Sequence, residues 1–212
     1  MDTKEKIIKV SSKIFAKLGF SGVRIDALVK EIGINKATFY YHFKSKKEIF
    51  EVIVTENVQK LQNEIDKKLS ACKTPEEKIK GFIDVMFERE RLDVLLIIRE
   101  IIDGGDNLSD EIILLMSSIK DRLYKILREG KQQGNFINDD ATFIMYLILG
   151  VSDFFIISDP FAQKFNNIQK EHFPIDERKF IEKFKNTVIN AIFAVFENNN
   201  TTLAQKEITC KF

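Results

Sequence analysis

The 212-residue sequence contains no tryptophan, only three prolines and nine glycines, and two cysteines. Proline and glycine are the residues that interrupt helices, so their scarcity leaves long stretches free to form helices and favours an all-α protein. The cysteines, Cys72 and Cys210, lie far apart without a CxxC motif. This spacing argues against a disulfide framework or a zinc site and is typical of a reducing cytoplasm, so we expect no metal and no cofactor.

Long hydrophobic runs are also missing. The N-terminus is charged and shows no signal peptide. The most apolar run, residues 143–157, contains Ser152 and Asp153 and is too short to cross a bilayer, so a buried helix explains it better than a membrane span. No phosphate-binding loop, nucleophile motif or carboxylate pair stands out. We therefore expect a cytoplasmic protein that is neither an enzyme nor membrane-bound.

What the sequence does contain is an uneven distribution of charge. The whole chain has a net charge of +1. Residues 1–47 hold eleven Lys and Arg against four Asp and Glu, a net charge of +7, and the remainder carries −6. A basic first quarter on an acidic body is the electrostatic signature of a partner such as DNA, although a solvated lysine-rich helix face has the same composition.

Apolar residues recur at spacings of three and four in successive segments, and this periodicity predicts about nine helices in all. We expect them at about residues 3–18, 25–32, 35–43, 45–69, 75–87, 92–102, 109–134, 139–158 and 176–197. Asp159-Pro160 is expected to end the eighth helix and to begin a phenylalanine-bearing loop. The predicted organisation is a DNA-binding domain at 1–47, a helical ligand-binding and dimerisation domain at 48–197, and a polar tail at 198–212.

The second and third of these helices are short and separated by a tight turn at Gly33. Asn35 is a residue type that begins helices by accepting a backbone hydrogen bond. Two short helices joined in this way predict a helix-turn-helix, whose second helix enters a DNA groove. Phe39 and Phe43 are expected to anchor that helix in the core.

Three segments, Ile7–Phe20, Ile25–Ile34 and Asn35–Ile49, resemble the DNA-binding domain of the TetR family of bacterial regulators. The most diagnostic part is the run Phe-Tyr-Tyr-His-Phe-Lys-Ser-Lys at residues 39–46. The resemblance covers about the first fifty residues; the remainder agrees only in architecture. It implies a homodimer that binds a palindromic operator and usually represses transcription until a small molecule releases it.

The resemblance also assigns residues to DNA contact. The positions that match those of family members are Lys36, Ala37, Thr38, Tyr40, Tyr41, His42 and Lys46. Arg24 departs from the family pattern, which often has Thr there, and is added because an arginine reaches a phosphate or a guanine edge. Thr38, Tyr40, His42 and Lys46 suit phosphate contacts, whereas Lys36, Ala37 and Tyr41 suit base contacts. For Tyr40 and Tyr41, the alternative to DNA contact is a partly structural role. Removing the charge of Lys46 is expected to weaken binding to all sequences and to lower its salt dependence.

The body of the chain provides two further sets of candidates. Apolar and flexible side chains that suit a ligand pocket are Phe82, Met86, Phe87, Met116, Ile119, Leu123, Met145 and Phe154. The broad apolar faces of the last two helices suggest a dimer interface formed by Ile148, Val151, Phe155, Phe184, Val188, Ile192 and Phe196. Plain core packing remains the alternative for each pocket residue. For the whole chain, the alternatives are a DNA-binding regulator or architectural protein without an inducer, and a helical binding module or enzyme on the same fold.

Overall fold

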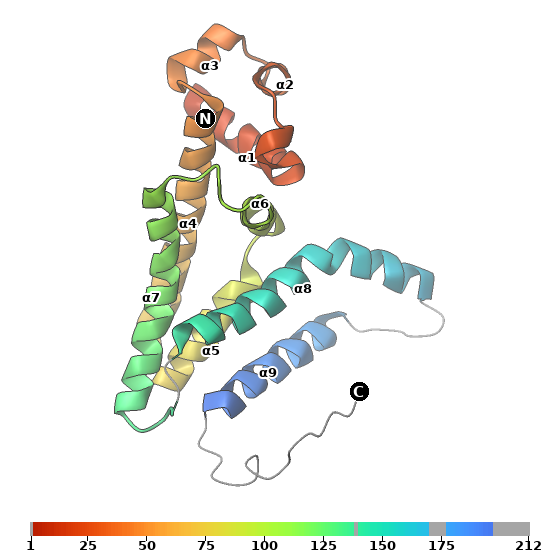
Figure 1. The fold of residues 1–212 in the computed structure, drawn as a ribbon. Coiled ribbons are helices and arrows are strands. Elements are labelled where there is room, and N and C mark those ends of the chain that lie inside the picture. The colour runs from red at the N-terminus through yellow and green to blue at the C-terminus, as the bar shows by residue number, and fades with distance from the viewer. Residues whose placement is uncertain (1, 138–139, 170–176, 197–212) are drawn as a thin grey trace, which may run out of the picture.

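The computed structural model describes residues 2–137, 140–169 and 177–196, and these ranges contain only helices and their connections (Figure 1). The helices are α1 (Thr3–Gly22), α2 (Ile25–Ile32), α3 (Lys36–His42), α4 (Lys46–Ser70), α5 (Pro75–Glu88), α6 (Arg91–Ile102), α7 (Asp110–Gln132), α8 (Ala141–Gln169) and α9 (Glu177–Phe196). The all-α expectation is confirmed. Helices α1–α3 gather at one end, α5, α8 and α9 at the other, and α4 and α7 run side by side between them.

The N-terminal unit forms where the sequence provides caps and buried anchors. Gly33 ends α2 in the left-handed conformation, with φ of 76°, and its N–H donates to the carbonyls of Val29 and Lys30. The Asn35 side chain then begins α3 by accepting a 2.8 Å bond from the Thr38 N–H. A seven-residue helix is marginal alone. Phe39, which is fully buried, holds it against the other helices.

Helix α4 belongs to both parts of the molecule. Ser45 caps its start by accepting from the Glu48 N–H at 3.0 Å. The Phe50 ring lies 5.1 Å from the rings of both Phe15 and Phe20, inside the N-terminal core. Further along, α4 packs against α5 and α7. The expected domain boundary at residue 47 therefore falls within the first turn of a continuous helix.

Helix α8 differs from its prediction. Pro160 does not end it; the helix runs from Ala141 to Gln169 and bends in its second half (Figure 1). Proline removes one helical hydrogen bond and its ring crowds the preceding turn, which kinks a helix without necessarily ending it. The resulting window, Ala141–Phe165, has a mean hydropathy of 1.9 and is long enough to cross a membrane by length and composition, which corrects the estimate that it is too short. Only 39% of the window is buried, in contact with α5, α6, α7 and α9, so one part of the helix belongs to the core.

Helix α6 connects the two parts of the molecule. It packs extensively against α1, and the Arg99 Nε donates a 2.8 Å hydrogen bond to the Ala16 carbonyl near the end of that helix. The α6–α7 connection is held by Glu100, which is 3% exposed and accepts from the backbone and side-chain N–H groups of Asn107. Helix α6 is therefore in direct contact with the N-terminal unit.

Candidate nucleic-acid interface and cavity

Helix α3 divides its side chains between the core and solvent. Phe39 and Phe43 are 0% and 2% exposed, so their predicted anchoring role is confirmed. The residues predicted to contact DNA lie on the outer side: Lys36, Ala37, Tyr40 and Tyr41 are exposed, Thr38, His42 and Lys46 are partly exposed, and Arg24 is exposed just before α2. The helix thus presents a contiguous polar and aromatic face, fixed from behind by two phenylalanines.

The two tyrosines of this face differ in how far they are held by the protein. The Tyr40 ring packs edge-on against Phe39 at 5.4 Å and is 51% exposed. Tyr41 is 85% exposed, and its ring contacts only the neighbouring His42 ring, at 5.1 Å, among the described aromatic pairs. Tyr40 therefore has a partly structural role, and Tyr41 is the more available for a groove.

Lys36 has a partner already. Its Nζ lies 2.5 Å from the Asp26 carboxylate of α2, and both side chains are more than half exposed. This hydrogen bond, together with the charge of Asp26, raises the pKa of Lys36. The pair ties the first turn of α3 to α2, and a DNA phosphate or base would compete with Asp26 for the same ammonium group.

Lys46 holds the helix-turn-helix together from its far side. Its Nζ donates 3.0 Å hydrogen bonds to the carbonyls of Phe20 and Val23 and lies 4.1 Å from the centre of the Phe20 ring. Phe20 belongs to the last turn of α1 and Val23 is the residue that follows this helix, so Lys46 ties the start of α4 to the end of α1. This structural role was missed from the sequence, and the phosphate contact stays a prediction.

Replacing Lys46 with methionine is expected to lower the free energy of unfolding by about 1.5 kcal/mol, because two charge-assisted hydrogen bonds and a cation–π contact are lost. Lys47→Met removes the same charge from an exposed neighbour and is expected to leave stability unchanged. Urea unfolding of both variants checks this. Equal midpoints for the two variants would contradict the structural role.

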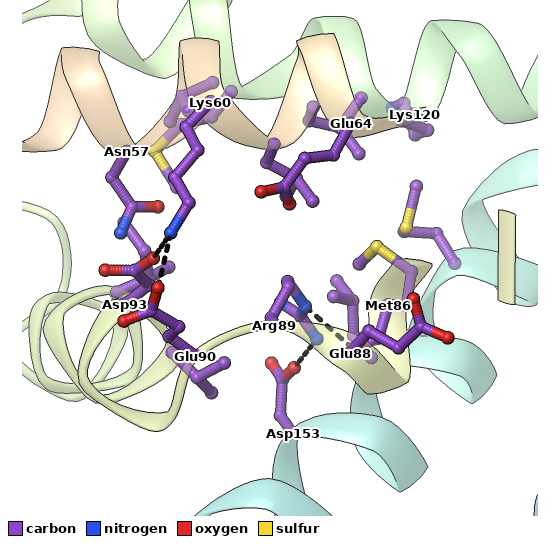
Figure 2. Close-up of a pocket in the computed structure, with 18 of the residues that line it drawn as sticks. Asn57, Lys60, Glu64, Met86, Glu88, Arg89, Glu90, Asp93, Lys120 and Asp153 are labelled. Carbon is purple, nitrogen blue, oxygen red and sulfur yellow. Dashed lines mark hydrogen bonds and ion pairs between the residues drawn. The ribbon is translucent and has the colours of Figure 1, made fainter. Parts of the chain in front are cut away.

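A cavity of about 240 Å³ lies in the larger domain between α4, α5, α6, α7 and α8 (Figure 2). Three methionines line it, Met86, Met116 and Met145, which are all the methionines of the chain except Met1. Ile119 also lines it, so four of the eight predicted pocket residues lie in the cavity wall. The other four do not line it. They are the fully buried core residues Phe82 and Leu123, Phe87, whose ring packs on Phe155 and Phe184, and the 69% exposed Phe154. Apolar periodicity placed these side chains on the right helices but not on the right faces.

The cavity walls also carry ion pairs that the sequence analysis missed. Arg89, in the connection between α5 and α6, donates to the Met86 carbonyl, the Ser152 hydroxyl and the Asp153 carboxylate. Burial raises the pKa of Asp153 although Arg89 acts in the opposite direction. The sequence does contain an indication of this pair, namely an aspartate within an apolar run, because a buried carboxylate needs a partner of opposite charge.

On the opposite wall, Lys60 of α4 donates to Glu90 at 3.0 Å and to Asp93 at 2.9 Å. The hydrogen bond to Asp93 and, to a smaller extent, that to Glu90 raise the pKa of Lys60, although burial acts against them. Each of the two residues that follow α5 is therefore bonded to another helix, Arg89 to α8 and Glu90 to α4. The start of α6 is held in place by these pairs.

The predicted dimer residues occupy a different face from the expected one. Ile148 and Ile192 are 0% and 3% exposed and belong to the core of the same chain, which corrects their assignment. Phe155 and Phe184 stack on each other at 5.3 Å, joining α8 to α9. Val151 and Val188 are partly buried. The side chain of Phe196 lies outside the described residues.

The exposed apolar residues of α8 lie elsewhere on that helix. They follow one face at helical spacing and are defined here as the outer α8 stripe: Phe143, Tyr146, Phe154, Phe161, Phe165 and Ile168, each between 48% and 75% exposed. A contiguous apolar surface of this kind marks an interaction site. Within the described residues, no group of three or more His, Cys, Asp or Glu side chains is arranged to hold a metal ion.

Comparisons with known proteins agree with this architecture. The family model described as bacterial regulatory proteins, tetR family, matches residues 7–53. The uncharacterized HTH-type transcriptional regulator YerO of Bacillus subtilis is 34% identical over 134 residues, 60% of this chain and 43% of that protein. IcaR of Staphylococcus aureus, a negative transcriptional regulator of a biofilm operon, is 44% identical over 48 residues, 23% of this chain and 26% of that protein.

The chain spans less than half the length of these curated relatives. Among solved structures, AibR in complex with isovaleryl coenzyme A and operator DNA has a TM-score of 0.67 at 14% identity, covering 91% of this chain and 98% of that one. That likeness shows the shared fold. The family match shows that residues 7–53 form a helix-turn-helix domain of the tetR family of bacterial regulatory proteins.

Proposed function

We propose that the protein is a ligand-responsive transcriptional repressor of bacteria, acting in the cytoplasm as a homodimer on a palindromic DNA operator. The observation that carries the proposal is the outer face of α3, where exposed Tyr41, Lys36 and Ala37 stand on the buried anchors Phe39 and Phe43. Repression is supported by the name of IcaR, a negative regulator. Ligand response is supported by the cavity and by the complex of AibR with both an acyl coenzyme A and its operator.

Contacts with DNA divide by chemistry. Lys36, Ala37 and Tyr41 are proposed to read base edges in the major groove, with the Ala37 methyl against a thymine methyl. Phosphate contacts that fix the register are proposed for Thr38, Tyr40, His42 and Lys46, and Arg24 is proposed to reach a phosphate or a guanine. Two half-sites lie about 34 Å apart, one helical turn of DNA, so the distance between the two α3 helices decides whether both fit.

The partner copy is proposed to cover the outer α8 stripe. This surface is apolar, exposed and continuous along the helix, and burying it removes a large apolar area from water. The proposal replaces the interface expected from the sequence by a different face of α8. The same burial accounts for the high hydropathy of a helix that packs against four others.

The cavity is proposed to regulate DNA binding through α6. Asp93, Val94, Ile97 and Ile101 place this helix in the cavity wall, and Arg99 on the same helix bonds to the end of α1. An effector that changes the position of α6 would shift the N-terminal unit and with it the distance between the two α3 helices. This arrangement favours a ligand-responsive repressor over a regulator without an inducer.

Tyr41→Ala is expected to weaken operator binding at least tenfold without changing the urea midpoint, because its side chain is 85% exposed and makes no contact with the core. Tyr124→Ala, a change at an exposed tyrosine of α7, serves as the matched control. DNA selected from a random pool by the purified protein provides the operator, and mobility-shift titration gives the affinities. Selection of no preferred palindrome would overturn the proposed function and favour a binding module or enzyme on this fold.

A further inference from the structure

The cavity has an unusual lining for a chain with 19 phenylalanines, because no aromatic side chain of the described residues lines it. Its apolar part is made of aliphatic residues and the three methionines Met86, Met116 and Met145. Methionine is unbranched and flexible, so such a wall adapts to the shape of an aliphatic group. With no ring present to stack on, the lining does not favour a flat aromatic ligand over an aliphatic one.

The charges on the cavity wall favour one sign of ligand. The wall contains five carboxylates and three basic groups. The carboxylates are those of Glu64, Glu88, Glu90, Asp93 and Asp153, and the basic groups are those of Lys60, Arg89 and Lys120. This excess of acids gives the wall a net charge of −2. A charged ligand entering a partly enclosed space is selected by the sign of the field inside it.

Most of the charged groups in the wall already have a partner of opposite charge. Arg89 is committed to three acceptors on α5 and α8, and Lys60 to two carboxylates. Lys120 is the remaining base of the described lining and is exposed on α7. Glu64 and Lys120 make no ion pair or hydrogen bond among the described residues. Figure 2 shows the Glu64 carboxylate pointing from α4 into the space opposite Arg89. An ammonium group entering the cavity would find Glu64 without a partner, and a carboxylate would find Lys120, so the excess of acids in the wall decides between the two signs of charge.

We propose that the effector is a small cationic amphiphile, with an aliphatic body against the methionines and an ammonium head beside Glu64. This inference rests on the proposed ligand-responsive function and adds the chemical class of the ligand. The cavity of about 240 Å³ is about eight times the roughly 30 Å³ that a water molecule occupies in the liquid. The part of the ligand inside the cavity is therefore small, with a longer tail leaving through its open side.

Calorimetric titration of the full-length protein with three probes of similar size tests the inference: pentyltrimethylammonium, heptanoate and 1-octanol. The cation is expected to bind at least tenfold more tightly than the anion, with the neutral alcohol between them. Glu64→Gln is expected to weaken binding of the cation about tenfold and to leave binding of the alcohol unchanged. Glu56→Gln, which makes the same change on α4 outside this cavity, is the matched control.

Equal or tighter binding of heptanoate, or no binding of any probe, would overturn the inference, and so would equal effects of the Glu64 and Glu56 variants. Both substitutions are at exposed positions, so loss of folding does not confuse the result. Affinity for the selected operator is measured without any probe. Absence of operator binding would contradict the proposed DNA-binding function. Absence of a preference for the cationic probe would contradict only the proposed class of effector.

Discussion

Arg89→Met is expected to lower the free energy of unfolding by about 3–5 kcal/mol, because it leaves the Asp153 carboxylate buried without its partner. Both side chains of the pair are only 12% exposed, so solvent screens the interaction weakly. The same substitution also releases the Met86 carbonyl and the Ser152 hydroxyl. Urea unfolding followed by circular dichroism measures the loss.

Two comparison variants separate the buried charge from general disruption. Arg122→Met breaks the pair with Asp66, whose side chain is 55% exposed, and is expected to cost less than about 1 kcal/mol. Adding Asp153→Leu to Arg89→Met removes the unpaired carboxylate and is expected to restore most of the lost stability. If the double variant is less stable than Arg89→Met, the account of the buried charge is wrong.

The cost of Arg89→Met is expected to depend on pH. Burial already raises the pKa of Asp153, and loss of Arg89 removes the main influence that lowers it. A carboxyl group whose folded-state pKa lies above its unfolded value of about 3.9 destabilises the fold once it ionises. The stability difference between wild type and variant should therefore be small near pH 4 and grow as the pH rises through the folded-state pKa. A difference that shrinks between pH 5 and pH 8 would contradict this assignment.

Phe154→Glu is expected to convert the protein to a monomer and to reduce operator affinity about 100-fold or more, because two linked half-site contacts become separate ones. Phe154 lies at the middle of the outer α8 stripe and is 69% exposed, so a charge there leaves the core of one chain intact. Leu114→Glu is the matched control, because Leu114 is also 69% exposed but lies on α7, away from the stripe. Native mass spectrometry gives the oligomeric state of each variant.

Unchanged dimer mass for Phe154→Glu, or dissociation by Leu114→Glu, would place the interface elsewhere. Thermal unfolding of the Phe154 variant at low protein concentration, where a wild-type dimer also dissociates, reports on the fold of the single chain. Equal melting temperatures under that condition are expected.

The N-terminal unit was predictable because its signals are local. The cap at Asn35, the stop at Gly33 and the inward spacing of Phe39 and Phe43 lie within ten residues of one another. The helices of the larger domain followed from apolar periodicity for the same reason. Helix α8 is the exception, since it continues past Pro160 to Gln169 although the side chains described there are exposed.

The cavity and the dimer surface depend on contacts between distant residues, which local patterns do not encode. Lys60 and Asp93 are 33 positions apart, and Arg89 and Asp153 are 64 apart. On a helix that is apolar nearly all round, sequence alone does not tell which face meets the core. Ile148 therefore proved to be buried and Phe154 exposed, the reverse of their expected placement for interface and pocket.

The continuity of α4 has a geometric consequence. Phe50 sits in the N-terminal core and Glu64 in the cavity wall, 14 residues apart on one unbroken helix, or about 21 Å at 1.5 Å per residue. Tilting a rod of that length by about 5° moves its far end by about 2 Å. Each of two copies would contribute such a displacement. In the proposed dimer, a small tilt of α4 around a bound molecule would therefore change the distance between the two α3 helices by more than the length of a hydrogen bond.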